Sequence, residues 1–170
     1  MKSIILASKS EVRKKILDDN KIKCSVEPSN LDEDEVKKSL LNQGANPELI
    51  SKNLAELKAN KVSQKNLGEI VLGADSVIDL EDKLVSKPTN RIEAMNILNL
   101  LNGKSHFLIS SVCISLDGKM IWNYTEKAEM IMKNFTQKEL ENYLSKISDK
   151  NLYAYNVYQI EGEGRNLFAS

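Results

Sequence analysis

The segment from Glu69 to Leu80 constrains the fold most, because it places the carboxylate of Asp75 inside an apolar, strand-like run. Asp75 follows the apolar stretch 70–74 directly, and apolar residues resume soon after it. A carboxylate in an interior strand is costly unless it is paired, hydrogen-bonded or bound to a metal ion. Asp75 is therefore either a general base or cation ligand, or an aspartate satisfied by a nearby helix start. Gly73 and Ala74 keep the adjacent backbone bare, and we expect them to leave space for a ligand.

Strand-like runs alternate with helical stripes along the chain. The expected strands are 4–7, 24–27, 69–80, 106–116, 120–132 and 157–160, and Asp117-Gly118 marks a hairpin. Expected helices begin near residues 8, 46, 90 and 136, whereas the acidic stretch 29–38 is a solvated loop or a helix start. This order predicts one α/β (mixed α+β) domain over residues 1–170, with a central mixed sheet and flanking helices.

The helix signals also predict individual side-chain positions. Ser8 and Glu11 have the spacing of a capping box at the first helix. Leu57 is expected on the inner face of the second helix, and Ile92 belongs to the apolar residues of the third helix, which is expected to stop at Gly103.

The charge balance limits the classes of partner. Lys+Arg and Asp+Glu both total 24, so the formal net charge is zero. Nucleic acid polymers and anionic membrane surfaces are therefore not expected as partners, whereas a small anionic substrate needs only a local cationic cluster. The N-terminus does not read as a signal peptide, and no apolar stretch reaches about 18 residues. We expect a cytoplasmic protein without a membrane span.

Reactive side chains that many hydrolases use are scarce. Cys24 and Cys113 lie in apolar runs and are interpreted as buried free thiols rather than as a disulfide or metal ligands. His106 is the single histidine, which argues against a histidine-based metal site or a Ser-His-Asp triad.

Cationic and hydroxyl side chains gather where the first strand turns into the first helix. Free backbone N–H groups and the helix dipole favour an anion at such a turn. Ser8, Ser10 and Arg13 lie there, together with three lysines. A capped surface helix with solvated lysines is the commoner interpretation of this pattern taken alone.

Two further lysines are candidates for phosphate contacts. Lys87 precedes Pro88, which holds its backbone extended on a defined loop, although an exposed loop lysine is the commoner case. Lys58 borders the apolar face of the second helix, where a snorkelling lysine is the simple alternative.

Seven segments, in order along nearly the whole chain, resemble signature motifs of the Maf nucleotide pyrophosphatases. They are Leu6-Ala7-Ser8-Lys9-Ser10-Glu11-Val12-Arg13, Leu31-Asp32-Glu33, Leu54-Ala55-Glu56-Leu57-Lys58-Ala59, Gly73-Ala74-Asp75-Ser76, Ser86-Lys87-Pro88, Asn102-Gly103-Lys104-Ser105-His106 and Tyr158-Gln159-Ile160-Glu161-Gly162. Each motif alone is weak, but their order and spread make the resemblance specific.

The resemblance implies an inosine-triphosphatase-like fold with a cleft between two lobes, a homodimer, and hydrolysis of nucleoside triphosphates between the α- and β-phosphates. It implies Asp75 as catalytic base and a magnesium or manganese ion held by Glu33 and Asp75. The residues implied to bind the triphosphate are Ser8, Ser10, Arg13, Lys58 and Lys87. A role in removing non-canonical or modified nucleotides is also implied.

The departures from the family pattern concern substrate preference and the chain end. Val12, Ser76 and Glu161 stand at positions implied to face the base, so a pyrimidine preference does not carry over. Asn156 replaces a usual glycine, a change that its tolerance of left-handed backbone makes mild. The family continues past the position of Ser170 with a Gly-Asp and Gly-Leu-Pro segment and a closing helix, and we expect that segment to be absent or not described.

Two rival functions remain at this stage. A nucleotide-binding regulator of cell division would bind nucleotide without turnover, and another metal-dependent phosphohydrolase would release orthophosphate.

Overall fold

The computed structural model describes residues 2–169, and the chain forms two compact units. Unit 1 comprises the chain up to Ser76 together with Ile109–Lys127. Unit 2 comprises Val77–Leu108 together with the chain from Ala128 onward. The divisions fall inside long strands, so these strands contribute to both units, and each unit has its own apolar core.

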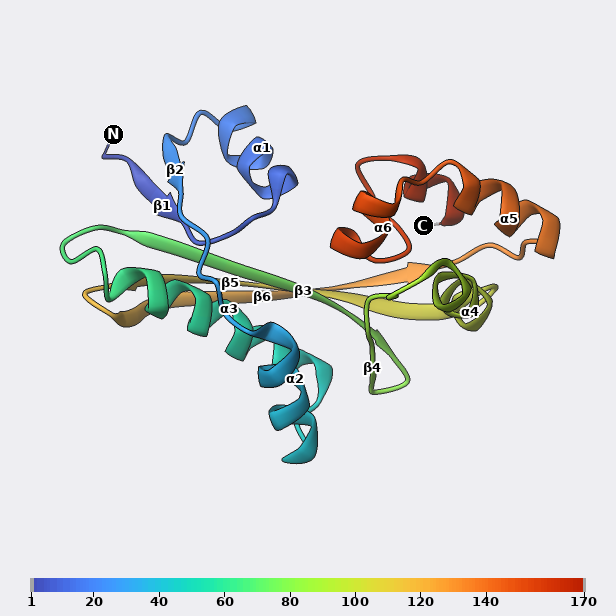
Figure 1. Ribbon diagram of the computed structural model, residues 1–170, viewed down its shortest axis with the longest axis horizontal. Helices are drawn as coiled ribbons and strands as arrows, with labels where there is room; N and C mark the ends of the chain where they lie inside the picture. Colours follow the sequence, from blue (N-terminus) through green and yellow to red (C-terminus); the bar gives the residue numbers. More distant parts are fainter. Residues whose placement is uncertain (1, 170) are drawn as a thin grey trace. The chain divides into compact units, whose positions relative to one another are not determined.

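Within residues 2–169, six strands form one mixed sheet in the order β2-β1-β3-β5-β6, with β4 paired to β3 (Figure 1). The strands are β1 (Ile4–Leu6), β2 (Cys24–Val26), β3 (Val71–Leu80), β4 (Lys83–Val85), β5 (Ser105–Leu116) and β6 (Lys119–Ile131). β1 pairs in parallel with β2 and β3, whereas β4 runs antiparallel to β3. The mixed sheet with its helices confirms the predicted fold class.

The α-helices lie between successive strands or after the last strand. They are α1 (Glu11–Asp19), α2 (Glu33–Asn42), α3 (Pro47–Ser63), α4 (Arg91–Leu101), α5 (Gln137–Ser145) and α6 (Asp149–Tyr155), followed by a 3-10 helix at Glu163–Leu167. The acidic stretch left open by the sequence is thus the start of α2, and α6 lies where no helix was expected.

Local signals located most helix starts correctly. The side chains of Asn46, Asn90 and Thr136 each accept a hydrogen bond from a backbone N–H of the following helix. The capping box expected between Ser8 and Glu11 is wrong. Ser10 caps α1 instead, since its hydroxyl oxygen accepts a hydrogen bond from the backbone N–H of Arg13.

In unit 1, α3 packs against β3 through one face (Figure 1). The buried apolar residues of that face are Ile50, Leu54, Ala55, Ala59 and Val62. Leu57 was expected among them but is 40% exposed. The next position, Lys58, lies on the buried face instead, so the inner stripe of α3 is partly polar.

The contact between α3 and β3 depends on Gly73. A Cβ atom at this position would lie 2.4 Å from the carbonyl oxygen of Ala55 and 2.8 Å from the amide nitrogen of Ala59. The sequence-based expectation that Gly73 leaves space for a ligand is therefore wrong, because the backbone of α3 fills that space. The glycine acts by letting a helix approach the strand closely.

Unit 2 has a core built mainly from α4, α5 and the residues after α6. On α4 the buried residues are Ala94, Leu98 and Leu101, whereas Ile92 is 76% exposed. Residue 92 falls on the side of the helix opposite to that stripe.

The strand expected at 157–160 is absent from the described structure, although Val157 and Tyr158 are buried there. Side-chain hydrogen bonds replace the strand ladder. Tyr143 donates to the carbonyl oxygen of Val157, and the Tyr158 hydroxyl lies 2.8 Å from Nε2 of His106. Burial alone produced the strand-like pattern.

Asn156, which precedes this segment, has a φ of 68°. With a ψ of −161°, Asn156 lies outside the left-handed helical region that asparagine tolerates, in a conformation that is almost confined to glycine, so the change from glycine is strained rather than mild. Its side-chain carbonyl accepts from the amide of Val157 at 2.8 Å, which helps to hold the strained turn.

We expect Gly73→Ala to destabilise unit 1 by about 3 kcal/mol, near the upper end for overpacking, because the added methyl group meets backbone atoms that cannot rotate away. Urea unfolding followed by circular dichroism measures this change. Gly162→Ala is the matched control, since a Cβ there meets no heavy atom within 4 Å. Equal midpoints for the two variants would contradict the close approach of α3.

Candidate functional site

Asp75 and Lys58 form a buried ion pair in unit 1. Asp75 lies in the middle of β3 and is 6% exposed, and Lys58 lies on the inner face of α3 and is 7% exposed. The Nζ atom of Lys58 lies 3.0 Å from Oδ1 of Asp75. The simple interpretation of Lys58 as a snorkelling lysine is thus wrong, because its charged end is buried rather than held in water.

The ammonium of Lys58 is surrounded by three oxygen acceptors. Besides Asp75, it donates to the carbonyl oxygen of Ala74 at 3.2 Å and contacts Oε1 of Glu33. An ammonium has three N–H donors, so these oxygens match its full donor capacity.

Glu33 reaches this cluster from the first turn of α2. Asp32 caps that helix by accepting from the amide of Glu35. The cap fixes where the helix begins, and the side chain of Glu33 is 37% exposed. The two carboxylates proposed from sequence as metal ligands therefore meet at one lysine.

The second carboxylate oxygen of Asp75 has a different environment. Oδ2 is buried and has no hydrogen-bond partner among the described residues. Burial raises the pKa of Asp75 above its ordinary value, while the positive charges of Lys58, Lys37 and Arg13 act in the opposite direction. An unpartnered buried oxygen with a raised pKa can accept a proton or a cation.

A second hydrogen bond fixes the backbone beside this carboxylate. The hydroxyl of Ser51 donates to the carbonyl oxygen of Asp75 at 3.1 Å. Sequence reasoning missed Ser51, although it lies seven residues before Lys58 and therefore on the same helix face. Ser51 and Lys58 together attach α3 to consecutive carbonyl groups of β3.

The loop between β1 and α1 brings Ser8, Ser10 and Arg13 together. The hydroxyl oxygen of Ser8 accepts from the amide of Ser10 at 3.1 Å and from Nη1 of Arg13 at 3.3 Å. The hydroxyl of Ser10 caps α1 by accepting from the amide of Arg13 at 3.2 Å. The sequence-predicted cluster of hydroxyl, guanidinium and helix start is therefore present as one hydrogen-bonded loop.

Two residues proposed to influence base preference also lie in unit 1. Val12 is half-buried on α1, and Ser76 is exposed on β3. The hydroxyl of Ser76 lies 3.0 Å from that of Ser110 on β5, a partner that sequence reasoning missed. Because side chains alternate along a strand, Ser76 faces the opposite side of the sheet from Asp75.

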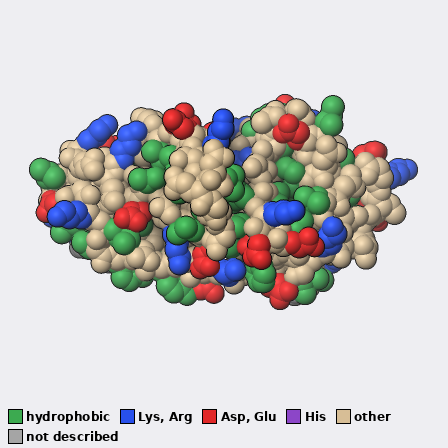
Figure 2. Space-filling view, turned by 90° about the horizontal axis from the view of Figure 1, so that it is seen from below, with side chains coloured by type: hydrophobic (Ala, Val, Ile, Leu, Met, Phe, Trp, Pro, Cys, Tyr) green, Lys and Arg blue, Asp and Glu red, His purple; other side chains and the backbone are tan. Residues whose placement is uncertain are grey.

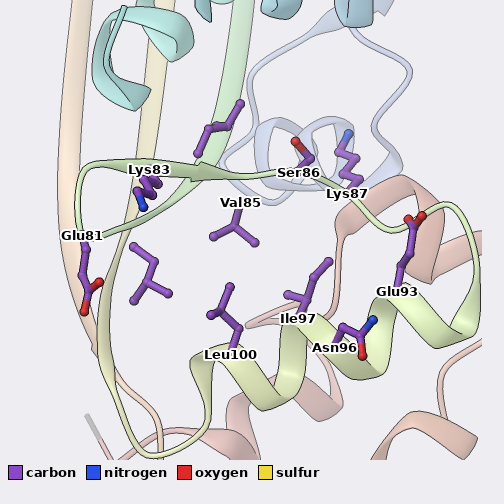
Figure 3. A pocket seen from close by; sticks show the side chains of 11 residues that line it. Glu81, Lys83, Val85, Ser86, Lys87, Glu93, Asn96, Ile97 and Leu100 are labelled. Atoms are coloured by element: carbon purple, nitrogen blue, oxygen red, sulfur yellow. The ribbon is translucent and has the colours of Figure 1, made fainter.

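Lys87 and Glu161 belong to unit 2, and both are exposed. Lys87 lies on the loop after β4, beside a pocket of about 480 Å³ between β4 and α4. In Figure 3 the side chains of Val85, Ile97 and Leu100 point into this pocket, whereas the side chain of Lys87 points away from these three. Glu161 lies in the turn before the 3-10 helix.

The remaining expectations on reactive groups have mixed outcomes. Cys24 and Cys113 are both free, as predicted, but only Cys113 is buried. Among the described residues, no three His, Cys, Asp or Glu side chains are grouped as a metal centre. A metal ion at Glu33 and Asp75 would therefore need other oxygen ligands to complete its shell.

Charged side chains of both signs share the surface of the protein. On the face seen in Figure 2, cationic and anionic side chains are intermingled rather than segregated. Within residues 2–169, no helix has both the length and the apolar character needed to cross a membrane.

Comparison with known proteins identifies relatives over almost the whole chain. A family model described as Maf-like protein matches residues 3–170. The chain is 71% identical over 169 residues to a nucleoside triphosphate pyrophosphatase of Pelagibacter ubique strain HTCC1062, a match that covers 99% of this chain and 87% of that protein. It is 36% identical to a 7-methyl-GTP pyrophosphatase of Brucella abortus biovar 1 strain 9-941, with 97% and 83% covered.

A solved structure supports the fold independently. The HAM1 protein from Coxiella burnetii matches with a TM-score of 0.51 at 14% identity, over 78% of this chain and 73% of that chain.

We expect Lys58→Met to destabilise the protein by about 3 kcal/mol at neutral pH, because it leaves two carboxylates near each other without their shared cation. The loss should shrink at acid pH, since removing the lysine raises the pKa of Asp75 further and protonation then removes the charge. Urea unfolding at several pH values measures both effects. A loss that does not depend on pH would contradict an electrostatic origin.

Proposed function

Because the chain belongs to the Maf family, we propose that it is a nucleoside triphosphate pyrophosphatase, which hydrolyses the bond between the α- and β-phosphates. The products are a nucleoside monophosphate and pyrophosphate. The observation that carries this proposal is the 71% identity to a protein of that name, which extends over 99% of this chain. The regulator without turnover is not favoured, since the relatives are named as enzymes.

We place Asp75 in the role of general base. Its Oδ2 atom is buried and has no hydrogen-bond partner among the described residues, which supports a function in accepting the proton of the attacking water. Water attacks the α-phosphorus, the bond to the bridging oxygen breaks, and that oxygen leaves with the pyrophosphate. The protein forms no covalent bond, so positioning and charge neutralisation do most of the work.

The triphosphate needs cationic and hydrogen-bonding partners. Arg13 and the hydroxyl groups of Ser8 and Ser10 form one loop at the start of α1, an arrangement that suits a phosphate group. Lys58 and Lys87 complete the proposed set. Val12 and Glu161 are proposed to influence the choice of base, whereas Ser76 faces the other side of the sheet from Asp75 and is left out of this set.

A divalent cation fits the carboxylates of Glu33 and Asp75. Magnesium and manganese take oxygen ligands, and magnesium is commonly held by one or two carboxylates while phosphate oxygens and water supply the rest. The Oδ1 atom of Asp75, which Lys58 contacts, would be one such ligand, and Glu33 is partly exposed to solvent. When bound, the ion would neutralise charge on the phosphates.

A homodimer and a cytoplasmic location stay part of the proposal. Analytical ultracentrifugation of the purified chain tests the dimer directly.

We expect Asp75→Asn to lower kcat by about 10²- to 10⁴-fold, the range for loss of a general base, while nucleotide binding persists. Pyrophosphate release is measured for GTP, 7-methyl-GTP and the other common triphosphates, with magnesium or manganese. Orthophosphate as the first product would indicate another phosphohydrolase. Nucleotide binding with no product from the wild-type protein would instead support the regulator.

We expect kcat/KM of the wild-type enzyme to rise with pH, because a general base works only when it has lost its proton. Burial raises the pKa of Asp75, so the rising limb should lie above the ordinary carboxyl value of 3.8. A profile measured from acid to mildly alkaline pH at fixed metal concentration tests this. A limb centred at or below that value would show that a bound cation, rather than burial, sets the pKa of Asp75 in the metal-loaded enzyme.

A further inference from the structure

The oxygen cluster around Lys58 has the composition of a cation site. Two carboxylate oxygens, from Glu33 and Asp75, and the main-chain carbonyl of Ala74 contact one ammonium nitrogen. Carboxylate and carbonyl oxygens are also the ligands that hard divalent cations take. The ammonium and a metal ion therefore require the same atoms.

We propose that Lys58 and a divalent cation compete for the carboxylate oxygens of Asp75 and Glu33, so that metal binding displaces the lysine. This inference rests on the proposed function, because it concerns the metal-dependent state of the same site. It assigns Lys58 a role before substrate arrives, as a resident counter-ion.

The balance of charge supports competition rather than joint binding. Two carboxylates and one ammonium leave a single negative charge in a site where Asp75 and Lys58 are buried. Adding a divalent cation beside the ammonium would reverse that sign and place like charges next to each other away from water. Displacement of the lysine leaves two negative and two positive charges, which balance.

The competition concerns Oδ1 of Asp75, because Oδ2 has no hydrogen-bond partner among the described residues. This atom is buried, whereas Oδ1 of the same carboxylate is taken by Lys58. The long stem of a lysine allows its ammonium to move while its Cα atom stays on α3. The displaced ammonium can then contact a phosphate group, which reconciles its observed partners with its proposed contact to the triphosphate.

Manganese binding in the absence of nucleotide tests the competition without any turnover. Lys58→Met should bind Mn²⁺ about tenfold or more tightly than the wild-type protein in calorimetric titration, because the competing charge is gone. Lys58→Arg keeps that charge and should bind no more tightly than wild type. Lys52→Met removes a charge from the exposed side of α3, where it pairs with Glu48, and should leave Mn²⁺ affinity unchanged.

A double variant tests whether the gain in Mn²⁺ affinity depends on the carboxylate of Asp75. Adding Asp75→Asn to Lys58→Met should abolish the tighter binding. Equal Mn²⁺ affinity of Lys58→Met and wild type would overturn the proposal, as would a gain that survives the loss of the Asp75 carboxylate.

A second measurement uses the wild-type protein and does not depend on any variant folding. Acetylation of lysines, followed by mass spectrometry, reports how accessible each ammonium is. Lys58 should react slowly without metal and several-fold faster with Mg²⁺, while Lys52 should react equally in both conditions. No change at Lys58 under saturating Mg²⁺ would overturn displacement.

The two proposals fail separately. Pyrophosphate release without tighter Mn²⁺ binding by Lys58→Met would leave the hydrolase standing and remove the competition. Competition without pyrophosphate release would do the reverse.

Discussion

The ion pair between Lys58 and Asp75 is the interaction on which the organisation of unit 1 depends. It joins α3 to β3 at the point where the strand carries a charge into an apolar interior. Buried ion pairs contribute little net stability compared with apolar residues of similar volume, because both charges lose their hydration. A buried pair at such a site therefore points to a chemical use, and the unpartnered Oδ2 of Asp75 indicates where that use lies.

The pair forms because the backbones of α3 and β3 come unusually close. Gly73 removes the side chain that would separate them, and Ser51 bonds the strand carbonyl next to the lysine. The Gly-Ala-Asp segment therefore has two linked functions. Gly73 allows α3 to approach β3, and Asp75 forms the ion pair with Lys58 of that helix. The sequence shows the motif but not the partner, since Lys58 lies 17 residues away along the chain.

Much of the fold follows from local patterns, and much of the candidate site does not. Asn46 and Thr136 cap their helices as predicted because a cap involves only residues within the next turn. The contact of Lys58 with Glu33 joins two helices and depends on how they pack. The strand predicted at 157–160 failed for a different reason. Burial in the core of unit 2 gave this segment a strand-like pattern, although the described structure does not form a strand there. Periodicity reports which side chains are buried, and it does not report what buries them.

The ammonium of Lys58 cannot contact Asp75 and a phosphate group of the substrate at the same time. While it contacts Asp75, its charge opposes the burial that raises the pKa of that carboxyl, and so it helps to keep the base ionised. If the ammonium moves to a phosphate, Asp75 loses that support and would take up a proton more readily at neutral pH. The carboxylate can then act as a base only if another positive charge replaces the lysine. Exchange of one cation for another, rather than simple loss of the lysine, is therefore the arrangement under which both roles are compatible.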